Sequence, residues 1–178
     1  MCKQKLFLDI DDTLVDTESY LRLRLRYILG SNVVGKYDNI YNLMLDDEVA
    51  NGICRKELSD YRNIPFLPFA EECISVLKSD YDIILCSNYT FDEERCAKLL
   101  LADRLGVSSS LIRYTPNMGK AEVNMSDGIL VDNDVRILAN SNAKRKIRVR
   151  GYGLKDIWGG EEVEDCFELM AVLMLDGF

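Results

Sequence analysis

The sequence predicts an α/β fold in which a Rossmann-like, doubly wound parallel sheet carries helices on both faces. Short apolar runs typical of buried strands alternate with longer, helix-like segments. This alternation favours a parallel sheet with crossover helices. Several of the runs end in acidic or hydroxyl residues, which is where open α/β sheets place their ligand sites. The 178 residues, about half of them apolar, suit a single domain with a sizeable core.

The first strand is predicted at Leu6 to Leu8, within the sequence KLFLDIDDTLVDT. Asp9 and Asp11 follow on alternate positions, and Thr13 comes shortly after. Where a strand ends and turns, two such carboxylates can converge on one crevice. Their repulsion then requires a cation or a shared proton. Hard oxygen ligands of this kind favour Mg²⁺, which binds one or two carboxylates together with substrate phosphate.

The acidic segment also permits two different interpretations. Acidic residues at a strand end are often a solvated turn or a helix cap, and Asp16, Thr17 and Ser19 are suitable caps here. A calcium-binding loop is excluded, because Leu14 occupies the position of the required glycine and Tyr20 that of the closing glutamate.

Two later apolar runs end in polar residues in the same way. The segment Tyr81 to Tyr89 is predicted as a strand in which Ser87 and Asn88 follow the apolar residues. Backbone N–H groups leading into the next helix could face an anion there, although a lone serine is more often a turn residue. The segment Gly128 to Asp134 has the sequence GILVDND and brings Asp132 to a strand end.

These segments resemble, in order, the signatures of phosphatases of the haloacid dehalogenase superfamily. The first signature, Asp-x-Asp-x-Thr, is matched in full by Asp9, Asp11 and Thr13. The resemblance implies that Asp9 is a nucleophile that becomes an aspartyl phosphate. It implies that Asp11 is the general acid and base. A dehalogenase proper lacks the second aspartate, so Asp11 favours phosphoryl transfer.

The resemblance also assigns the remaining candidate residues. It implies that Ser87, with Asn88, holds the substrate phosphate, and that Lys120, twelve positions before Asp132, offsets the negative charge. Lys98 and Lys144 fit this role less well, since one lies inside a predicted helix and the other beyond the fourth signature.

The resemblance implies that Mg²⁺ is bound by Asp9, Asp11 and Asp132. The sequence departs from many relatives after Asp132, where Asn133 intervenes before Asp134. Either residue could be the supporting partner, as could Thr13 near the nucleophile.

The segment between the first two signatures is predicted to be helical. Three helices are expected, and the first ends at Gly30, although its LRLRLR sequence also fits a strand. The resemblance implies a small helical cap at 15–64 on an α/β core of 1–14 and 65–178. Such a cap excludes water and selects the leaving group. The three helices are expected at Thr17 to Leu29, Asp38 to Ala50 and Cys54 to Tyr61.

Arginines and tyrosines in this helical segment have two interpretations. Arg22, Arg24 and Arg26 could bind phosphate, but Glu18 lies four residues before Arg22 and could pair with it in a solvated stripe. Tyrosines such as Tyr41 could stack on a base, although packing is their commoner role.

The rest of the chain is expected to continue the alternation of helices and strands. The final strand is expected at the sheet edge, and the final helix is expected to pack on the core. The expected elements are a helix at Phe69 to Lys78, a strand at Ile83 to Cys86, a helix at Phe91 to Leu105, a strand at Ser110 to Tyr114, an edge strand at Ile147 to Tyr152 and a helix at Glu161 to Leu175.

Composition excludes several classes of function. The chain has no histidine, which excludes Ser-His-Asp, Cys-His and His-ligated zinc mechanisms. A net charge of −8 argues against a general surface for duplex nucleic acid. The six cysteines show no CxxC spacing and are expected to be reduced core residues. Without a signal-like or membrane-spanning apolar stretch, a cytoplasmic protein that binds no membrane is expected.

The function predicted on this basis is Mg²⁺-dependent hydrolysis of a phosphomonoester through an aspartyl phosphate. The spacing of the segments resembles the 5′-nucleotidase and 5′(3′)-deoxyribonucleotidase branch, so the expected substrate is a nucleotide or another small phosphorylated metabolite. The alternatives are the same chemistry on a sugar phosphate or on a nucleic-acid 3′-phosphate end, and a non-catalytic binding module on the same fold. The oligomeric state stays open.

Overall fold

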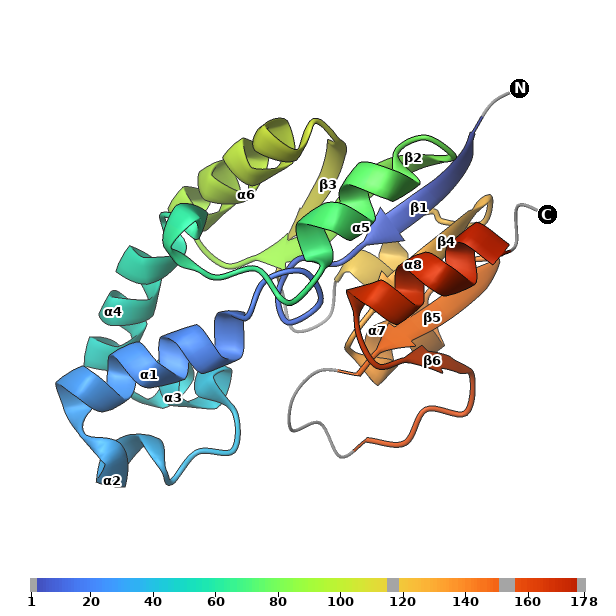
Figure 1. Ribbon diagram of the computed structural model, residues 1–178. Helices are drawn as coiled ribbons and strands as arrows, with labels where there is room; N and C mark the ends of the chain where they lie inside the picture. The colour runs from blue at the N-terminus through green and yellow to red at the C-terminus, as the bar shows by residue number, and fades with distance from the viewer. Residues whose placement is uncertain (1–2, 115–118, 151–155, 176–178) are drawn as a thin grey trace.

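A computed structural model of the chain describes residues 3–114, 119–150 and 156–175. Its strands form one six-stranded sheet in the order β3-β2-β1-β4-β5-β6, with every neighbouring pair parallel (Figure 1). The predicted α/β fold with a parallel sheet is confirmed. The strands are β1 (Gln4–Leu8), β2 (Tyr81–Tyr89), β3 (Ser108–Arg113), β4 (Gly128–Asp132), β5 (Arg145–Val149) and β6 (Glu161–Val163).

Helices cover both faces of the sheet, because each face is apolar. Helices α5 (Ala70–Leu77), α6 (Asp92–Leu105) and α8 (Cys166–Leu175) contribute to one large apolar cluster. Helix α7 (Val135–Asn140) contributes to a second, smaller cluster that contains Phe7 and Leu130. In Figure 1, α5 and α8 lie side by side across the near face of the sheet, and α7 lies behind it.

The chain reverses its direction of travel across the sheet at β1. It moves outward from β1 through β2 to β3 and then returns to place β4 on the other side of β1. Ligands of open α/β sheets bind at the carboxyl ends of the strands where such a reversal occurs. The backbone N–H of Asp9 donates to the carbonyl of Val131 at 3.0 Å, so the ends of β1 and β4 remain joined. Asp9 and Asp132 are therefore brought together by the topology.

The segment between β1 and α5 is helical, as predicted, and lies to the left of the sheet in Figure 1. The first predicted helix is confirmed, and Asp16 caps it by accepting a hydrogen bond from the backbone N–H of Ser19. The helices are α1 (Thr17–Leu29), α2 (Ser31–Val34), α3 (Ile40–Asp46), α4 (Glu48–Leu58) and a 3₁₀ turn, η1 (Tyr61–Asn63).

The predicted boundaries of the later helices in this segment were wrong. A single helix was expected over 38–50, but Asp47 has extended backbone angles and ends α3. Its side chain then accepts a hydrogen bond from the N–H of Ala50 at 2.9 Å and so begins α4. Helix α4 runs through Cys54 to Leu58, and α2 was not predicted.

The predicted carboxyl-terminal elements also need correction. The strand expected at the sheet edge is β5, which lies inside the sheet, and its predicted residues 151 and 152 lie outside the described residues. The expected final helix begins only at Cys166, because Glu161–Val163 forms the edge strand β6. Cross-strand ion pairs hold this short strand: Arg145 to Glu161 at 2.6 Å and Arg148 to Glu162 at 2.9 Å.

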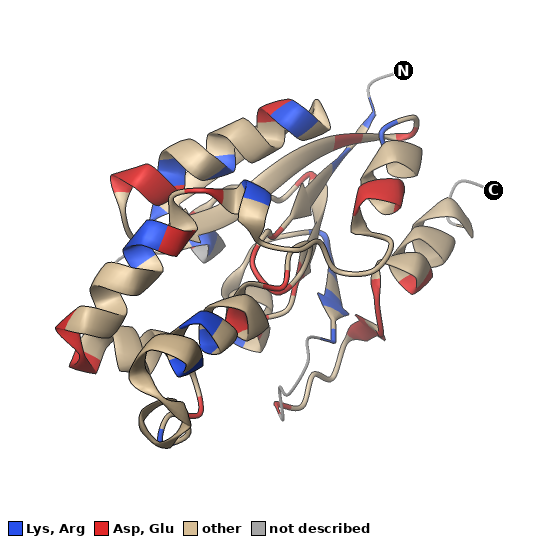
Figure 2. Cartoon of the chain, turned by 60° about the vertical axis from the view of Figure 1, so that its left-hand side comes forward, with Lys and Arg blue, Asp and Glu red and all other residues tan. Residues whose placement is uncertain are grey.

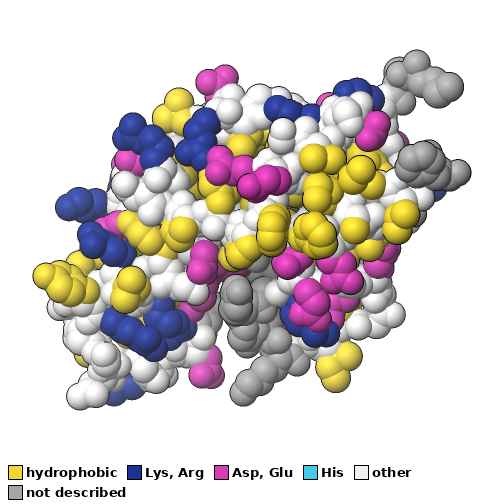
Figure 3. Space-filling model, viewed as in Figure 1, with side chains coloured by type: hydrophobic (Ala, Val, Ile, Leu, Met, Phe, Trp, Pro, Cys, Tyr) yellow, Lys and Arg dark blue, Asp and Glu magenta, His cyan; other side chains and the backbone are white. Residues whose placement is uncertain are grey.

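The surface of the described residues includes apolar side chains over α5 and α8 (Figure 3). Phe69 and Phe167 are both about half exposed, and their ring centroids lie 5.4 Å apart. Five cysteines are described; all are free, and all but Cys96 are buried. Within 3–114, 119–150 and 156–175, every helix is too short or too polar to traverse a lipid bilayer.

The close contact between β4 and β1 predicts a specific sensitivity at Gly128. A Cβ atom there would lie 2.7 Å from Phe7 Cε2 and 2.8 Å from the Lys5 carbonyl oxygen. We expect Gly128→Ala to lower the free energy of unfolding by about 1–3 kcal/mol through overpacking. In the matched control, Gly52→Ala at an exposed position of α4, nothing lies within 4 Å of the added Cβ, and we expect a gain of about 0.5–1 kcal/mol. Urea denaturation measures the free energy of unfolding of both variants. Equal stability of Gly128→Ala and wild type would contradict the close packing of Gly128 against β1.

Candidate active site

The carboxylates at the ends of β1 and β4 share one buried ammonium group. Lys120 lies at the start of a 3₁₀ turn, η2 (Lys120–Glu122), and its Nζ pairs with Asp9 Oδ1 and, at 2.7 Å, with Asp132 Oδ2. All three residues are at least 95% buried. Burying these carboxylates is tolerable because both are paired with the same ammonium group. The structure therefore brings together three of the residues that the sequence singled out.

Neighbouring residues orient these two carboxylates. The hydroxyl of Thr13 donates to Asp9 Oδ2 at 3.3 Å, and the backbone N–H of Asp134 donates to Asp132 Oδ1 at 2.8 Å. The Asp134 side chain caps α7 and pairs with Arg136 at 2.8 Å. Asn133 is half-buried between the two aspartates. Asp134 thus supports Asp132 through its backbone, while its carboxylate is engaged on the helix.

Asp11 has a different set of partners. Its Oδ1 accepts hydrogen bonds from the hydroxyls of Thr17 and Tyr61, each at 2.7 Å. Its Oδ2 accepts one from Lys98 Nζ at 2.6 Å, and the Ser87 hydroxyl lies 3.4 Å away. The Asp11 side chain is 16% exposed, whereas that of Asp9 is 5% exposed. The structure therefore places the two aspartates of the first motif in adjacent but distinct groups.

Lys98 belongs to this site, contrary to the expectation from sequence. Its position inside a helix made it a poorer candidate than Lys120, yet α6 carries its ammonium to the ends of β1 and β2. A recognisable signal was present in the sequence. Glu94 and Lys98 are four residues apart and share the helix face of Ala97 and Leu101, so two opposite charges lie on an apolar face.

Ser87 and Asn88 connect the two lysines. The Ser87 hydroxyl accepts a hydrogen bond from Lys98 Nζ at 3.1 Å. The Asn88 carbonyl accepts another from Lys98, and its side-chain Oδ1 accepts one from the backbone N–H of Lys120 at 3.1 Å. The end of β2 thus contacts both the Asp11 group and the Asp9 group through these two residues.

The site has more negative than positive charge. In Figure 2 the acidic residues of the loop that follows β1 lie near the centre of the molecule. Burial, with Asp9 adding to it, raises the pKa of Asp132 to about 7, despite the opposing Lys120. Burial and the charges of Asp11 and Glu18 raise the pKa of Asp12 to about 8. Burial alone would lower the pKa of Lys120, but Asp132 and Asp9 raise it above its usual value.

Asp11 is held as a carboxylate. Burial acts to raise its pKa, but the charge of Lys98 and the hydrogen bonds from Lys98, Thr17 and Tyr61 keep it below the usual value. For Lys98 itself, burial acts to lower the pKa, and Asp11 and Glu94 raise it. Asp11 and Lys98 therefore form an ion pair in which both groups are charged.

The donor set at β1 and β4 fits a hard divalent cation. The carboxylates of Asp9 and Asp132 both face the ammonium group of Lys120. Mg²⁺ commonly binds such a pair of carboxylates together with water and phosphate oxygens. Among the residues that the structure describes, no three histidine, cysteine, aspartate or glutamate side chains are gathered as a preformed metal cluster. The side chain of Asp11 in particular faces Lys98 and Tyr61.

Two tyrosines of the helical segment approach the acidic residues. Tyr61 donates to Asp11, and its ring centroid lies 5.5 Å from Lys98 Nζ. Burial raises the pKa of Tyr41 well above its usual value, and the charges of Asp11 and Asp12 add to this effect. The helical segment therefore contributes aromatic groups next to the strand ends.

The arginines of α1 are engaged within the protein. Arg22 pairs with Glu18 at 2.5 Å and donates to two backbone carbonyls, and Arg24 pairs with Glu57 at 2.9 Å. These contacts favour the interpretation of Arg22 and Arg24 as structural residues rather than as phosphate ligands.

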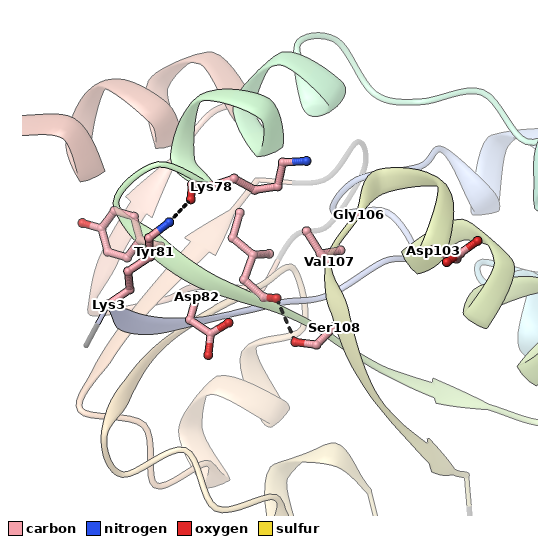
Figure 4. Close-up of a pocket in the computed structure, with 9 residues that line it drawn as sticks. Lys3, Lys78, Tyr81, Asp82, Asp103, Gly106, Val107 and Ser108 are labelled. Carbon is pink, nitrogen blue, oxygen red and sulfur yellow. Dashed lines mark hydrogen bonds between the residues drawn. The ribbon is translucent and has the colours of Figure 1, made fainter. Parts of the chain in front are cut away.

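A hollow of about 400 Å³ lies at the opposite end of the sheet, where β2 and β3 begin (Figure 4). Two of its polar side chains are used within the protein: Lys3 Nζ donates to the Lys78 carbonyl at 2.5 Å, and the Ser108 hydroxyl donates to the Ile83 carbonyl at 3.1 Å. None of the acidic strand-end residues lines it. We therefore place the candidate active site at the carboxyl ends of β1 and β4.

Comparison with solved structures finds the same fold in other proteins. A haloacid dehalogenase-type hydrolase from Bacillus subtilis, solved bound to magnesium, is 13% identical, with a TM-score of 0.65 over 97% of this chain and 99% of that chain. A protein from Lactobacillus plantarum assigned as a phosphoglycolate phosphatase is 12% identical, with a TM-score of 0.66 over 97% and 100%. A dehalogenase is 16% identical, with a TM-score of 0.67 over 96% of each chain.

No family model matches the chain, and no curated protein sequence matches it. The likeness to solved structures spans almost the whole chain at low identity, and it includes both phosphatases and dehalogenases. The chain therefore has the fold of the haloacid dehalogenase-like hydrolases.

Proposed function

We propose that the protein is a Mg²⁺-dependent phosphomonoester hydrolase that acts through an aspartyl phosphate on Asp9. The observation that supports this most strongly is the arrangement at the strand ends. Asp9 and Asp132 share Lys120 at the reversal point of the sheet, and Asp11, two residues after Asp9, is held by a second buried lysine. In this proposal the three carboxylates and two lysines supply a nucleophile, a separate acid and base, and cations for a phosphoryl group.

In the first step, an oxygen of Asp9 attacks phosphorus in line, and the bond from phosphorus to the leaving oxygen breaks. Asp11 gives its proton to that oxygen. Asp11 is a carboxylate beside Lys98, and the negative charge of an arriving phosphate next to it favours uptake of this proton. Ser87, Asn88 and Lys120 bind the non-bridging phosphate oxygens.

In the second step, water attacks the phosphorus of the aspartyl phosphate. Asp11, now a carboxylate again, accepts the proton from water, and the bond between phosphorus and Asp9 breaks to release phosphate. Asp9 and Asp132, with Asp11 as the third candidate ligand, would hold Mg²⁺, which neutralises charge on the phosphoryl oxygens when bound. The helical segment, 15–64, acts as a cap that excludes water and contacts the leaving group.

A nucleotide is the substrate that we propose within this reaction class. The support is Tyr41, a residue that is 36% exposed and whose hydroxyl pKa is raised in part by the charges of Asp11 and Asp12. Such an aromatic group can stack on a nucleobase. The same fold in a dehalogenase suggests a second candidate, but Asp11 and its hydrogen-bond donors favour the reaction that needs an acid for the leaving oxygen.

The test is phosphate release from nucleoside monophosphates, sugar phosphates and 3′-phosphorylated oligonucleotides, with chloride release from a 2-chloro acid as a further arm. We expect phosphate release, greatest with nucleotides, that disappears when Mg²⁺ is chelated and returns when it is restored. Tight binding of beryllium fluoride only with Mg²⁺ is expected in parallel. Folded protein that releases no phosphate from any ester would overturn the proposal. Binding of beryllium fluoride that does not depend on Mg²⁺ would then favour a binding module.

A further inference from the structure

Lys98 is a fully buried lysine in the body of α6. Its relative exposure is 0%, and it is among the largest side chains that are completely enclosed. Burial of an ammonium group is costly unless charges and hydrogen bonds compensate it, and an apolar residue of similar volume often gives equal or greater stability. Stability alone therefore does not account for a buried lysine here.

The contacts of Lys98 converge on the candidate active site. Its Nζ lies 2.6 Å from Asp11 Oδ2, 2.8 Å from Glu94 Oε1 and 3.1 Å from Ser87 Oγ, and it also donates to the Asn88 carbonyl. An ammonium group has three N–H donors, so the four acceptors around it exceed its hydrogen-bonding capacity. Lys98 is thus the common point of the ends of β1 and β2.

Glu94 keeps Lys98 in this position. It is 95% buried, four residues before Lys98 on α6, and its other carboxylate oxygen accepts a hydrogen bond from the backbone N–H of Thr90 at 2.7 Å. Thr90 directly follows β2, so Glu94 ties the helix to the strand end. Glu94 is therefore a second carboxylate that holds the ammonium, in addition to Asp11.

The two oxygens of Asp11 depend on different parts of the chain. Oδ1 is bound by Thr17 and Tyr61 of the helical segment, whereas Oδ2 is bound by Lys98 and lies 3.4 Å from Ser87 of the sheet. Without Lys98, the weak contact with Ser87 would be the remaining link of this carboxylate to the sheet among its described hydrogen bonds. The carboxylate could then turn with the helical segment and lose its alignment with the phosphate-binding residues.

We propose that Lys98 is a positioning residue that holds the Asp11 carboxylate in register with Ser87, and that Glu94 braces it. This inference rests on the proposed function, in which Asp11 moves the proton and Ser87 binds phosphate. Misplacement of a catalytic group by about 1 Å can lower a rate by about 10²-fold.

The test compares the variants Lys98→Met, Asp11→Asn and the double variant for phosphate release. We expect Lys98→Met to lower kcat by about 10²-fold with less than about a threefold change in KM, because the effect acts through alignment. In the Asp11→Asn background, Lys98→Met should cause little further loss, since the group that it positions is already gone. Lys98→Arg should recover part of kcat by restoring the charge-assisted hydrogen bond.

Two further variants serve as controls for effects on folding. Glu94→Gln/Lys98→Met removes the brace together with the lysine and so leaves no additional unpaired carboxylate on α6; it should fold and show the same low kcat. Arg104→Met, which removes the exposed ion pair of α6 with Glu71 at 3.1 Å, should keep wild-type kcat.

The possible outcomes separate this inference from the proposed function. An active wild type with unchanged kcat in folded Lys98→Met, or losses that multiply in the double variant, would overturn the role of Lys98 alone. Wild-type protein that releases no phosphate would overturn the proposed function and this role together.

Discussion

Replacement of Asp9 with asparagine is expected to lower phosphate release by at least about 10⁴-fold, the scale seen when a nucleophile is removed from an enzyme. The amide has nearly the same shape, but it is not nucleophilic and cannot form the aspartyl phosphate. Its oxygen can still accept the hydrogen bond from Thr13, which lies 3.3 Å from Asp9 Oδ2. Lys120 would still pair with Asp132, so the fold should be retained.

Initial rates with the best substrate at saturating Mg²⁺ measure this effect. The matched control is Asp82→Asn, which removes an exposed carboxylate on β2 at the opposite end of the sheet and should leave kcat unchanged. Residual activity of Asp9→Asn within about tenfold of wild type, after purification that excludes contaminating phosphatases, would rule out Asp9 as the nucleophile.

Replacement of Lys120 with methionine is expected to produce the largest loss of stability. It leaves Asp9 and Asp132 buried without their shared cation, and removal of one partner from a buried ion pair costs about 3–5 kcal/mol. Mg²⁺ should restore part of this, because a cation that binds only the folded state adds about 2.7 kcal/mol at a concentration 100 times its Kd. The gain from Mg²⁺ should be larger in the variant than in wild type, since the two carboxylates then lack any other cation.

Urea denaturation with Mg²⁺ and with a chelator measures both effects. Lys144→Met is the control, because Lys144 is exposed and lies away from both carboxylates along the chain, and its stability should follow wild type. A Lys120→Met variant that is as stable as wild type without Mg²⁺, or that gains nothing from Mg²⁺, would contradict the assignment of the shared cation site.

Much of the site could be predicted from sequence because it lies at strand ends. Apolar runs locate the strands, and a parallel sheet brings their carboxyl ends to one edge, so Asp9, Ser87 and Asp132 were expected to meet. The position of Lys120 in the order of the motifs predicted that its ammonium group lies near the acidic residues. Its contacts with Asp9 and Asp132 agree with that prediction.

Helical spacing puts Lys98 on the face of Ala97 and Leu101, but it does not show which strand ends that face meets, because this depends on the rotation of α6 about its own axis. That rotation depends on how Ala97, Leu101 and Ala102 pack, and it carries Glu94 and Lys98 inward with them. The side-chain direction of Asp11 was also beyond the sequence, since its partners Thr17 and Tyr61 lie 6 and 50 residues away along the chain.

The boundary errors have local physical causes. Asp47 ends α3 and also caps the start of α4. The apolar periodicity continues across Asp47, so the sequence pattern does not show the break between the two helices. The edge strand β6 consists of only three residues, and its two glutamates fit a helical pattern as well as a strand. The arginines of β5 decide in favour of the strand by pairing with them.

The most direct test of the central claim is to capture the covalent intermediate. Wild-type enzyme would be mixed with a phosphate-labelled substrate and Mg²⁺, quenched in acid during turnover, digested and analysed by mass spectrometry. The account predicts label on the carboxylate of Asp9, and none in Asp9→Asn or with Mg²⁺ chelated. Steady phosphate release by wild type with no label on Asp9 at any quench time, or with label on another residue, would contradict it.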